Sequence, residues 1–160
     1  MGNYFQGSKE TPYHISIGAV LRNGEGKIAT HYFEYFIHPR VGEAHDFHIL
    51  MRETVEPGES LEGVLARGLM EEFGATATLH SYIGSIVSHF PKGGVSIEKT
   101  TLYFLCDLVS INPALRSAED AEDGSEIQWN EPSYLISKMK EQLVRIGRED
   151  LDESKVLEAL

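Results

Sequence analysis

The stretch RETVEPGESLEGVLARGLMEEFGA, from Arg52 to Ala75, combines a turn-forming segment with one amphipathic helix. Ser60 follows a Pro-Gly pair and is a preferred N-cap residue, and Gly74 is a preferred residue for ending a helix. Apolar side chains recur between them at helical spacing: Leu61, Val64, Leu65, Leu69 and Phe73. This pattern predicts a helix that buries one face against the rest of the protein.

Two features of this helix work against its stability. Gly68 lies in its middle, where glycine costs about 1 kcal/mol relative to alanine. Glu71 and Glu72 lie at its C-terminal end, where the helix dipole disfavours negative charge. Together with Glu59 they form a set of carboxylates that suits Mg²⁺ or Mn²⁺, and a cation would offset the dipole penalty. The alternative is a solvated acidic helix end with a weak Arg67–Glu71 ion pair.

The spacing of this stretch resembles the signature of the Nudix hydrolase family. That signature is a glycine, five residues, a glutamate, seven residues, and then R-E-U-x-E-E-x-G-U, where U is an aliphatic residue. The residues that match it are Glu59, Arg67, Leu69, Glu71, Glu72 and Gly74. The resemblance implies an α/β fold of the α+β type, an α/β/α sandwich with a mixed sheet between helices. It also implies Mg²⁺- or Mn²⁺-dependent hydrolysis of a pyrophosphate bond in a nucleoside diphosphate linked to another group.

Two positions depart from the signature. Its opening glycine is replaced by Glu53, and the glutamate that follows the arginine is replaced by Gly68. In the family, both positions face the metal site. We therefore hypothesise that the side chain of Glu53 enters the space beside Gly68 and restores one carboxylate to the site. The alternative is that the two changes are unrelated and that the site has decayed.

The resemblance implies a role for each polar residue of the stretch. The predicted metal ligands are Glu53, Glu59, Glu71 and Glu72. The predicted catalytic residues are Glu53, Arg67, Glu72, Glu122 and Glu126, with Arg67 orienting the glutamates through an ion pair. Arg52 directly precedes the motif and is a candidate for binding a substrate phosphate, with a surface ion pair as the alternative.

Glu122 and Glu126 belong to the acidic segment SAEDAEDGSE, residues 117–126. They are candidates for the general base, because some members of the family take this base from a distant loop. The alternative is a solvated run of charges. The seven histidines show no metal-binding spacing such as H-E-x-x-H, so we expect each to be a strand or loop residue.

A second class of function stays open. Loss of the helix glutamate at position 68 predicts, as an alternative, a catalytically impaired Nudix-like domain that binds a nucleotide or a metal as a sensor or interaction module. The motif does not identify the substrate. Nucleotide sugars, dinucleoside polyphosphates, damaged nucleoside triphosphates and ADP-ribose all fit it, because specificity in this fold comes from residues outside the motif.

The composition predicts one globular domain. The chain has 160 residues and a net charge of −11, which disfavours binding to a nucleic-acid scaffold. It has no apolar run of the roughly 20 residues that a membrane span needs, and its single cysteine, Cys106, indicates a reducing, cytoplasmic setting. Residues 1–8 resemble the remnant of a tag-removal protease site, so we expect one domain over residues 9–160. A homodimer is compatible with the sequence.

The order of the expected elements predicts a mixed sheet with helices on its faces. The expected strands cover residues 14–21, 28–38, 47–51, 76–90, 95–109 and 125–129, with a hairpin turn near Gly93 and Gly94. The expected helices lie between Ser60 and Gly74, over residues 132–146 and over residues 152–160. We expect loops at residues 38–45 and in the segment that leads from Arg52 to the first helix.

Overall fold

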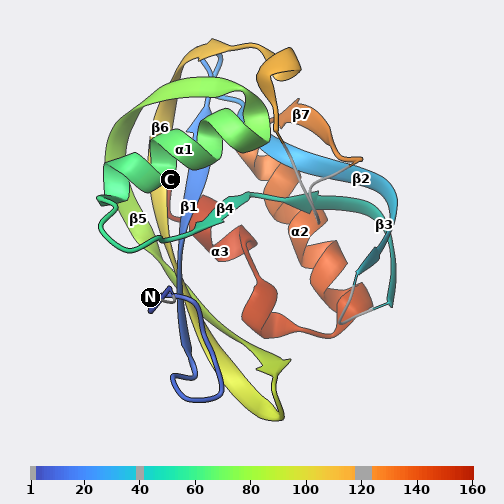
Figure 1. The fold of residues 1–160 in the computed structure, drawn as a ribbon. Coiled ribbons are helices and arrows are strands. Elements are labelled where there is room, and N and C mark those ends of the chain that lie inside the picture. The colour runs from blue at the N-terminus through green and yellow to red at the C-terminus, as the bar shows by residue number, and fades with distance from the viewer. Residues whose placement is uncertain (1–2, 39–41, 118–123) are drawn as a thin grey trace.

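The computed structural model describes residues 3–38, 42–117 and 124–160, which form one sheet flanked by helices (Figure 1). The strands are β1 (Tyr13–Arg22), β2 (Ile28–His38), β3 (Gly42–Ile49), β4 (Met51–Thr54), β5 (Ala75–Lys92), β6 (Val95–Ile111) and β7 (Glu126–Asn130). The helices are α1 (Leu61–Phe73), α2 (Pro132–Ile146) and α3 (Ser154–Leu157), with short 3-10 turns η1 (Pro113–Leu115) and η3 (Glu149–Leu151). Within these described ranges, no helix has the length and apolar character needed to cross a membrane.

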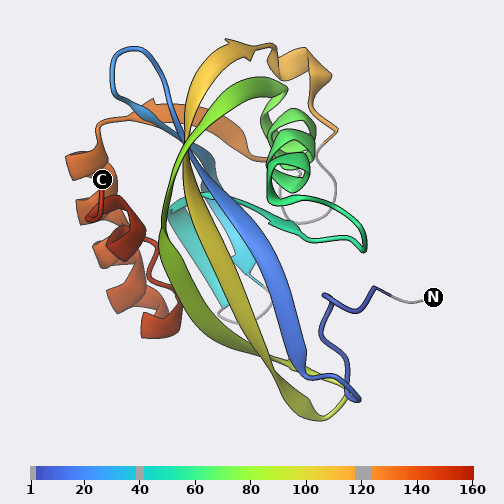
Figure 2. The same ribbon diagram turned by 90° about the vertical axis from the view of Figure 1, so that its left-hand side faces the viewer.

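The sheet is mixed. Its strands follow the order β3-β2-β1-β6-β5, with β4 paired to β1 and β7 paired to β2. β1 and β6 run parallel, whereas the other strand pairs are antiparallel. Figure 2 shows α1 on one face of the sheet and α2 with α3 on the other. The predicted sandwich, with a mixed sheet between helices, is confirmed.

Each face of the sheet carries its own hydrophobic cluster, because successive strand residues point in opposite directions. Ile17, Ala19 and Leu21 of β1 belong to the cluster beneath α1, together with Leu65 and Phe73. The cluster on the other face includes Val20, Leu50, Tyr103, Leu135 and Leu157. Burial on both faces holds α1, which carries the motif, in one position relative to the strands.

Helix α1 begins and ends where the sequence predicts. The side chain of Ser60 accepts a hydrogen bond from the amide of Gly63 at 3.1 Å, and Gly74 has a left-handed conformation with a φ of 63°. A Cβ atom at Gly74 would also lie only 2.0 Å from the backbone oxygen of Asn112. One part of the prediction is wrong, because Leu61 is exposed. Side chains at the start of a helix lean toward its N-terminus, away from the core that the later turns cover.

Part of the segment expected to be a loop is a strand. From Gly42 onward, residues 38–45 belong to β3, which pairs with β2, because backbone pairing overrides the turn-like local composition. The strand expected at residues 47–51 is divided between β3 and β4. Arg52 and Glu53, which we expected in a loop, lie in β4. The start of the motif is therefore held by hydrogen bonds to β1.

The long hairpin of β5 and β6 turns at Gly93 and Gly94, as predicted, and both glycines have positive φ. This hairpin extends beyond the helices at one end of the molecule (Figure 1). Near the N-terminus, Phe5 packs against the cluster beneath α1, and its backbone oxygen accepts a hydrogen bond from the amide of Ile15. The assignment of residues 1–8 to a tag remnant stays a prediction.

The cap at Ser60 leads to a first test of the fold. We expect Ser60→Ala to lower the free energy of unfolding by about 1 kcal/mol, because the amide of Gly63 loses its partner. Urea denaturation of the two proteins measures this difference. Ser60→Asp, which keeps an acceptor, serves as the control and should remain close to wild type, whereas an equal loss in both variants would contradict the capping role.

Candidate active site

Arg67 lies at the centre of the predicted glutamates. Its Nε and Nη2 atoms bind the two carboxylate oxygens of Glu59 at 2.8 and 2.9 Å, and Nη2 also donates to the backbone oxygen of Thr54. Its Nη1 atom faces Glu53 at 3.2 Å and Glu71 at 3.6 Å. Arg67 is therefore anchored by Glu59 and holds two further carboxylates. We call these four charged residues, Glu53, Glu59, Arg67 and Glu71, the Arg67 cluster.

Arg67 and Glu59, which form the shortest contacts in the Arg67 cluster, stabilise each other's charged form. The hydrogen bond from Arg67 holds the pKa of Glu59 below its ordinary value. The same hydrogen bond, followed by the charge of Glu53, raises the pKa of Arg67. Both groups are therefore ionised at neutral pH, and the bidentate Arg67–Glu59 ion pair is present under these conditions.

The side chain of Glu53 lies next to Gly68. A Cβ atom at Gly68 would be 3.0 Å from the Cβ atom of Glu53 and 3.0 Å from the Cε atom of Met51. Glu53 follows Met51 by two residues along β4 and shares its face of the strand, and Met51 packs beneath α1. A larger residue at position 68 would press on both side chains. The Cβ atom of Glu53 thus lies beside Gly68, while its carboxylate accepts a hydrogen bond from the amide of Thr54 and faces Arg67. That this carboxylate replaces the one missing at position 68 stays a prediction.

Glu72 lies apart from the Arg67 cluster, on the buried side of α1. It is 6% exposed, and its Oε2 atom lies 2.6 Å from Nε2 of His31 in β2. Burial, followed by the positive charges of Arg116 and Arg52, lowers the pKa of His31 to about 3. Burial and the two guanidinium groups thus favour the neutral imidazole, which can donate one hydrogen bond to Glu72 from Nε2.

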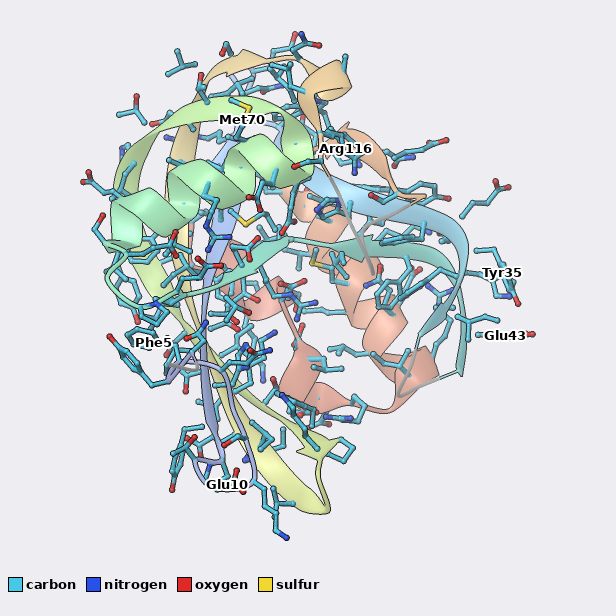
Figure 3. All side chains as sticks on the ribbon, viewed as in Figure 1. Phe5, Glu10, Tyr35, Glu43, Met70 and Arg116 are labelled. Carbon is cyan, nitrogen blue, oxygen red and sulfur yellow. The ribbon has the colours of Figure 1, made fainter. Side chains whose placement is uncertain are left out.

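Arg116 binds the C-terminal end of α1 (Figure 3). Its Nε atom donates to the backbone oxygen of Glu72 at 2.6 Å. Its Nη1 and Nη2 atoms donate to the backbone and side-chain oxygens of Ser125 at 3.0 and 2.8 Å. A guanidinium at this end of a helix offsets the dipole penalty of nearby glutamates. Arg116 therefore supplies part of the compensation that the sequence pattern suggested for a cation.

His31, Arg116 and Ser125 are candidates that the sequence pattern does not reveal. They come from β2, from the residue after η1 and from the residue before β7, so they become neighbours only in the folded chain. The sequence contained one signal for His31, because this residue is polar and lies within an apolar and aromatic strand. A polar side chain buried at such a position requires a hydrogen-bond partner.

Arg52 lies on the opposite face of β4 from Glu53, as the alternation of a strand requires. Its Nε atom is 3.8 Å from Oε2 of Glu153, so Arg52 has an ion-pair partner, although this partner is not at the surface as the alternative supposed. Glu153 is buried and also accepts hydrogen bonds from the amide of Leu50 and the hydroxyl of Tyr103. The predicted phosphate-binding arginine and the Arg67 cluster are therefore separated by the thickness of the strand.

The acidic segment, residues 117–126, is bound near the C-terminal end of α1 through its first residue and through the residue before Glu126. The amide of Ser117 donates to the backbone oxygen of Glu71 at 2.8 Å. At the other end, Arg116 binds the residue that precedes Glu126. Glu126 is exposed at the first position of β7. Glu122, the other candidate base, lies outside the described residues.

The donor set suits a hard divalent cation chemically, because it consists of carboxylate oxygens. Among residues 3–38, 42–117 and 124–160, no three His, Cys, Asp or Glu side chains are gathered as a ready metal site. Glu53 and Glu71 meet Arg67 through longer contacts than Glu59 does, and the side chain of Glu71 is 44% exposed. These two carboxylates can turn toward a cation while Glu59 keeps Arg67 in place.

A comparison with models of protein families identifies the family of this chain. A model of the NUDIX domain matches residues 12–149, which is most of the chain. The chain belongs to the Nudix family. Nudix proteins are generally hydrolases that act on small-molecule nucleotide derivatives and use divalent metals. The comparison with curated protein sequences finds no match.

Solved structures share the Nudix fold of this chain. The crystal structure of the MutT protein from Methanosarcina mazei Go1 matches with a TM-score of 0.56 and 22% identity, covering 94% of each chain. The solution structure of the E. coli ORF135 protein matches with a TM-score of 0.56 and 19% identity, over 92% of this chain and 87% of that one. A NUDIX hydrolase from Nitrosomonas europaea matches with a TM-score of 0.52 and 17% identity, over 83% and 85%. At these identities, the matches establish a common fold.

Proposed function

We propose that this Nudix protein hydrolyses the pyrophosphate bond of a nucleoside diphosphate linked to another group, in a reaction that needs Mg²⁺ or Mn²⁺. The observation that carries the proposal is the side chain of Glu53, whose Cβ atom lies beside Gly68 and whose carboxylate lies 3.2 Å from Nη1 of Arg67. The signature loses one carboxylate at position 68, and β4 brings another to the same side of α1. An active site that lacks the carboxylate at position 68 requires a replacement of this kind from another element.

The residues that would hold the cation are Glu53, Glu71 and Glu72, together with Glu59, whose carboxylate would be shared between the cation and Arg67. When bound, a cation neutralises charge that builds on the phosphoryl oxygens and lowers the pKa of the attacking water. Arg67 keeps Glu53 and Glu71 on one side of α1 and limits the repulsion between them. A cation would also allow a phosphate to approach a protein whose net charge is −11.

The remaining roles are proposed for residues around the Arg67 cluster. Glu122 and Glu126 are the candidates for the general base, and the attachment of the acidic segment to the end of α1 supports them. Arg52 is the candidate for binding a substrate phosphate, which requires it to exchange its contact with Glu153. We also propose a cytoplasmic location, on the basis of the single cysteine. A homodimer stays compatible with the chain.

A second candidate function is a sensor or interaction module that binds a nucleotide or a metal without turnover. The observation that favours it is the guanidinium of Arg67, which contacts three of the predicted ligands. In such a protein, Arg67 takes the place of a cation permanently. The described part of the chain, which lacks a ready group of three metal-binding side chains, is consistent with this candidate as well.

Phosphate release from a panel of nucleoside diphosphate derivatives, with and without Mg²⁺ or Mn²⁺, separates the two candidates. We expect turnover that depends on the cation and that falls by about tenfold or more in Glu53→Gln, which keeps the size of the side chain but removes its charge. Glu56→Gln, at an exposed glutamate of the following loop, is the matched control. Nucleotide binding without turnover on any substrate would support the sensor and contradict the hydrolase.

A further inference from the structure

His31 and Glu72 form the end of a hydrogen-bonded chain that begins at Arg116 and passes through Ser125. We propose that His31 is a positioning residue that holds the Glu72 carboxylate in one orientation for the cation, and that Arg116 and Ser125 select the tautomer of His31 that does so. The consequence for the cation rests on the proposed function. The hydrogen-bonded chain itself does not depend on it.

The direction of the chain follows from its donors. An arginine side chain can only donate hydrogen bonds, so Oγ of Ser125 accepts from Nη2 of Arg116 at 2.8 Å. The hydroxyl proton of Ser125 is then free to donate to Nδ1 of His31, which lies 2.9 Å from Oγ. Nη2 of Arg116 also lies 3.5 Å from Nδ1, which disfavours a proton on that nitrogen. Both contacts at Nδ1 favour a ring proton on Nε2, the atom that faces Glu72 at 2.6 Å.

Packing holds the same residues in place. His31 is completely buried, and its ring lies against Phe73 with the ring centroids 4.6 Å apart. Arg116 binds the backbone oxygen of Glu72 at 2.6 Å, in addition to its link through Ser125. The helix end and the carboxylate that it carries are thus tied to the same guanidinium. A carboxylate with one allowed orientation loses less entropy when it binds a cation.

The first test is the tautomer of His31 in the metal-free protein, which side-chain ¹⁵N chemical shifts report. We expect protonation at Nε2 alone in wild type, and a measurable fraction protonated at Nδ1 in Ser125→Ala. His48 provides an internal control, because it is also buried but bonds to Thr30 instead. Protonation of Nδ1 in wild type, or an unchanged tautomer in Ser125→Ala, would overturn the proposed chain.

The second test measures Mn²⁺ affinity by electron paramagnetic resonance for two variants of His31. His31→Gln places an amide N–H near the position of Nε2 and should bind Mn²⁺ nearly as tightly as wild type. His31→Leu has no donor, and we expect its affinity to fall by about 10- to 100-fold. Thermal unfolding of both variants shows whether each is folded.

The possible results separate this inference from the proposed function. Equal Mn²⁺ affinity in wild type, His31→Gln and His31→Leu would overturn the positioning role of His31 and leave the proposed function standing. No Mn²⁺ binding by wild type would contradict the proposed function together with the positioning role, while the ¹⁵N shifts would still decide whether the chain of hydrogen bonds exists. If His31→Leu is unfolded, His31→Phe replaces it as a donor-free variant with a ring that can pack on Phe73.

Discussion

Glu72→Gln is expected to lower the proposed cation-dependent hydrolysis by roughly 100-fold or more, because a bound metal contributes several kcal/mol of charge stabilisation to the transition state. The loss arises from the missing negative charge, since the amide oxygen can still accept the hydrogen bond from Nε2 of His31. Folding should therefore be preserved. Measurement of kcat at saturating Mg²⁺, with the melting temperature of each protein, checks both parts of the expectation.

The matched control for Glu72→Gln is Glu62→Gln, an exposed glutamate in the first turn of the same helix. It removes the same charge from α1 and should leave kcat near that of wild type. If Glu72→Gln also turns over at the wild-type rate, Glu72 is a buried structural carboxylate, and the cation is held without it. Equal losses in the two variants would instead indicate a general effect of charge on the helix.

We expect Gly68→Glu, which restores the family's glutamate, to destabilise the protein by about 1–3 kcal/mol when Glu53 is present, because it overpacks the space beside α1. The Cβ atom alone would lie 3.0 Å from side-chain atoms of Glu53 and Met51. In Glu53→Gly/Gly68→Glu, one of these contacts is gone, and the arrangement of the signature is restored. We expect this double variant to be more stable than Gly68→Glu and to hydrolyse substrate faster than either single variant.

A double-mutant cycle measures this coupling, with urea denaturation for stability and kcat for activity. We expect an interaction free energy of about 1 kcal/mol or more between positions 53 and 68. Ala66→Glu, which adds a glutamate at an exposed position of α1, serves as the control for added charge and should show no coupling to Glu53→Gly. Strictly additive effects at positions 53 and 68 would mean that the two departures from the signature are unrelated.

The motif helix could be predicted closely because its signals are local. The cap at Ser60, the glycine at position 74 and most of the apolar stripe each act within a few residues along the chain, and the structure has them as expected. The strand at Gly42–Ile49 could not be predicted in the same way, since its turn-like composition is overridden by pairing with β2. The location of Arg52 opposite Glu53 became evident only when both were found in one strand.

The sequence by itself determined the family, the limits of α1 and the identity of the acidic residues of the motif. It also suggested that Glu53 and Gly68 are related, because the spacing of the signature links the two positions. Only the tertiary structure decided which groups from other elements bind Glu72 and the helix end that carries it. Arg116 binds the helix end, where a cation was expected. His31 binds Glu72 from 41 residues away. Such contacts depend on how strands and helices pack, and no local propensity records that packing.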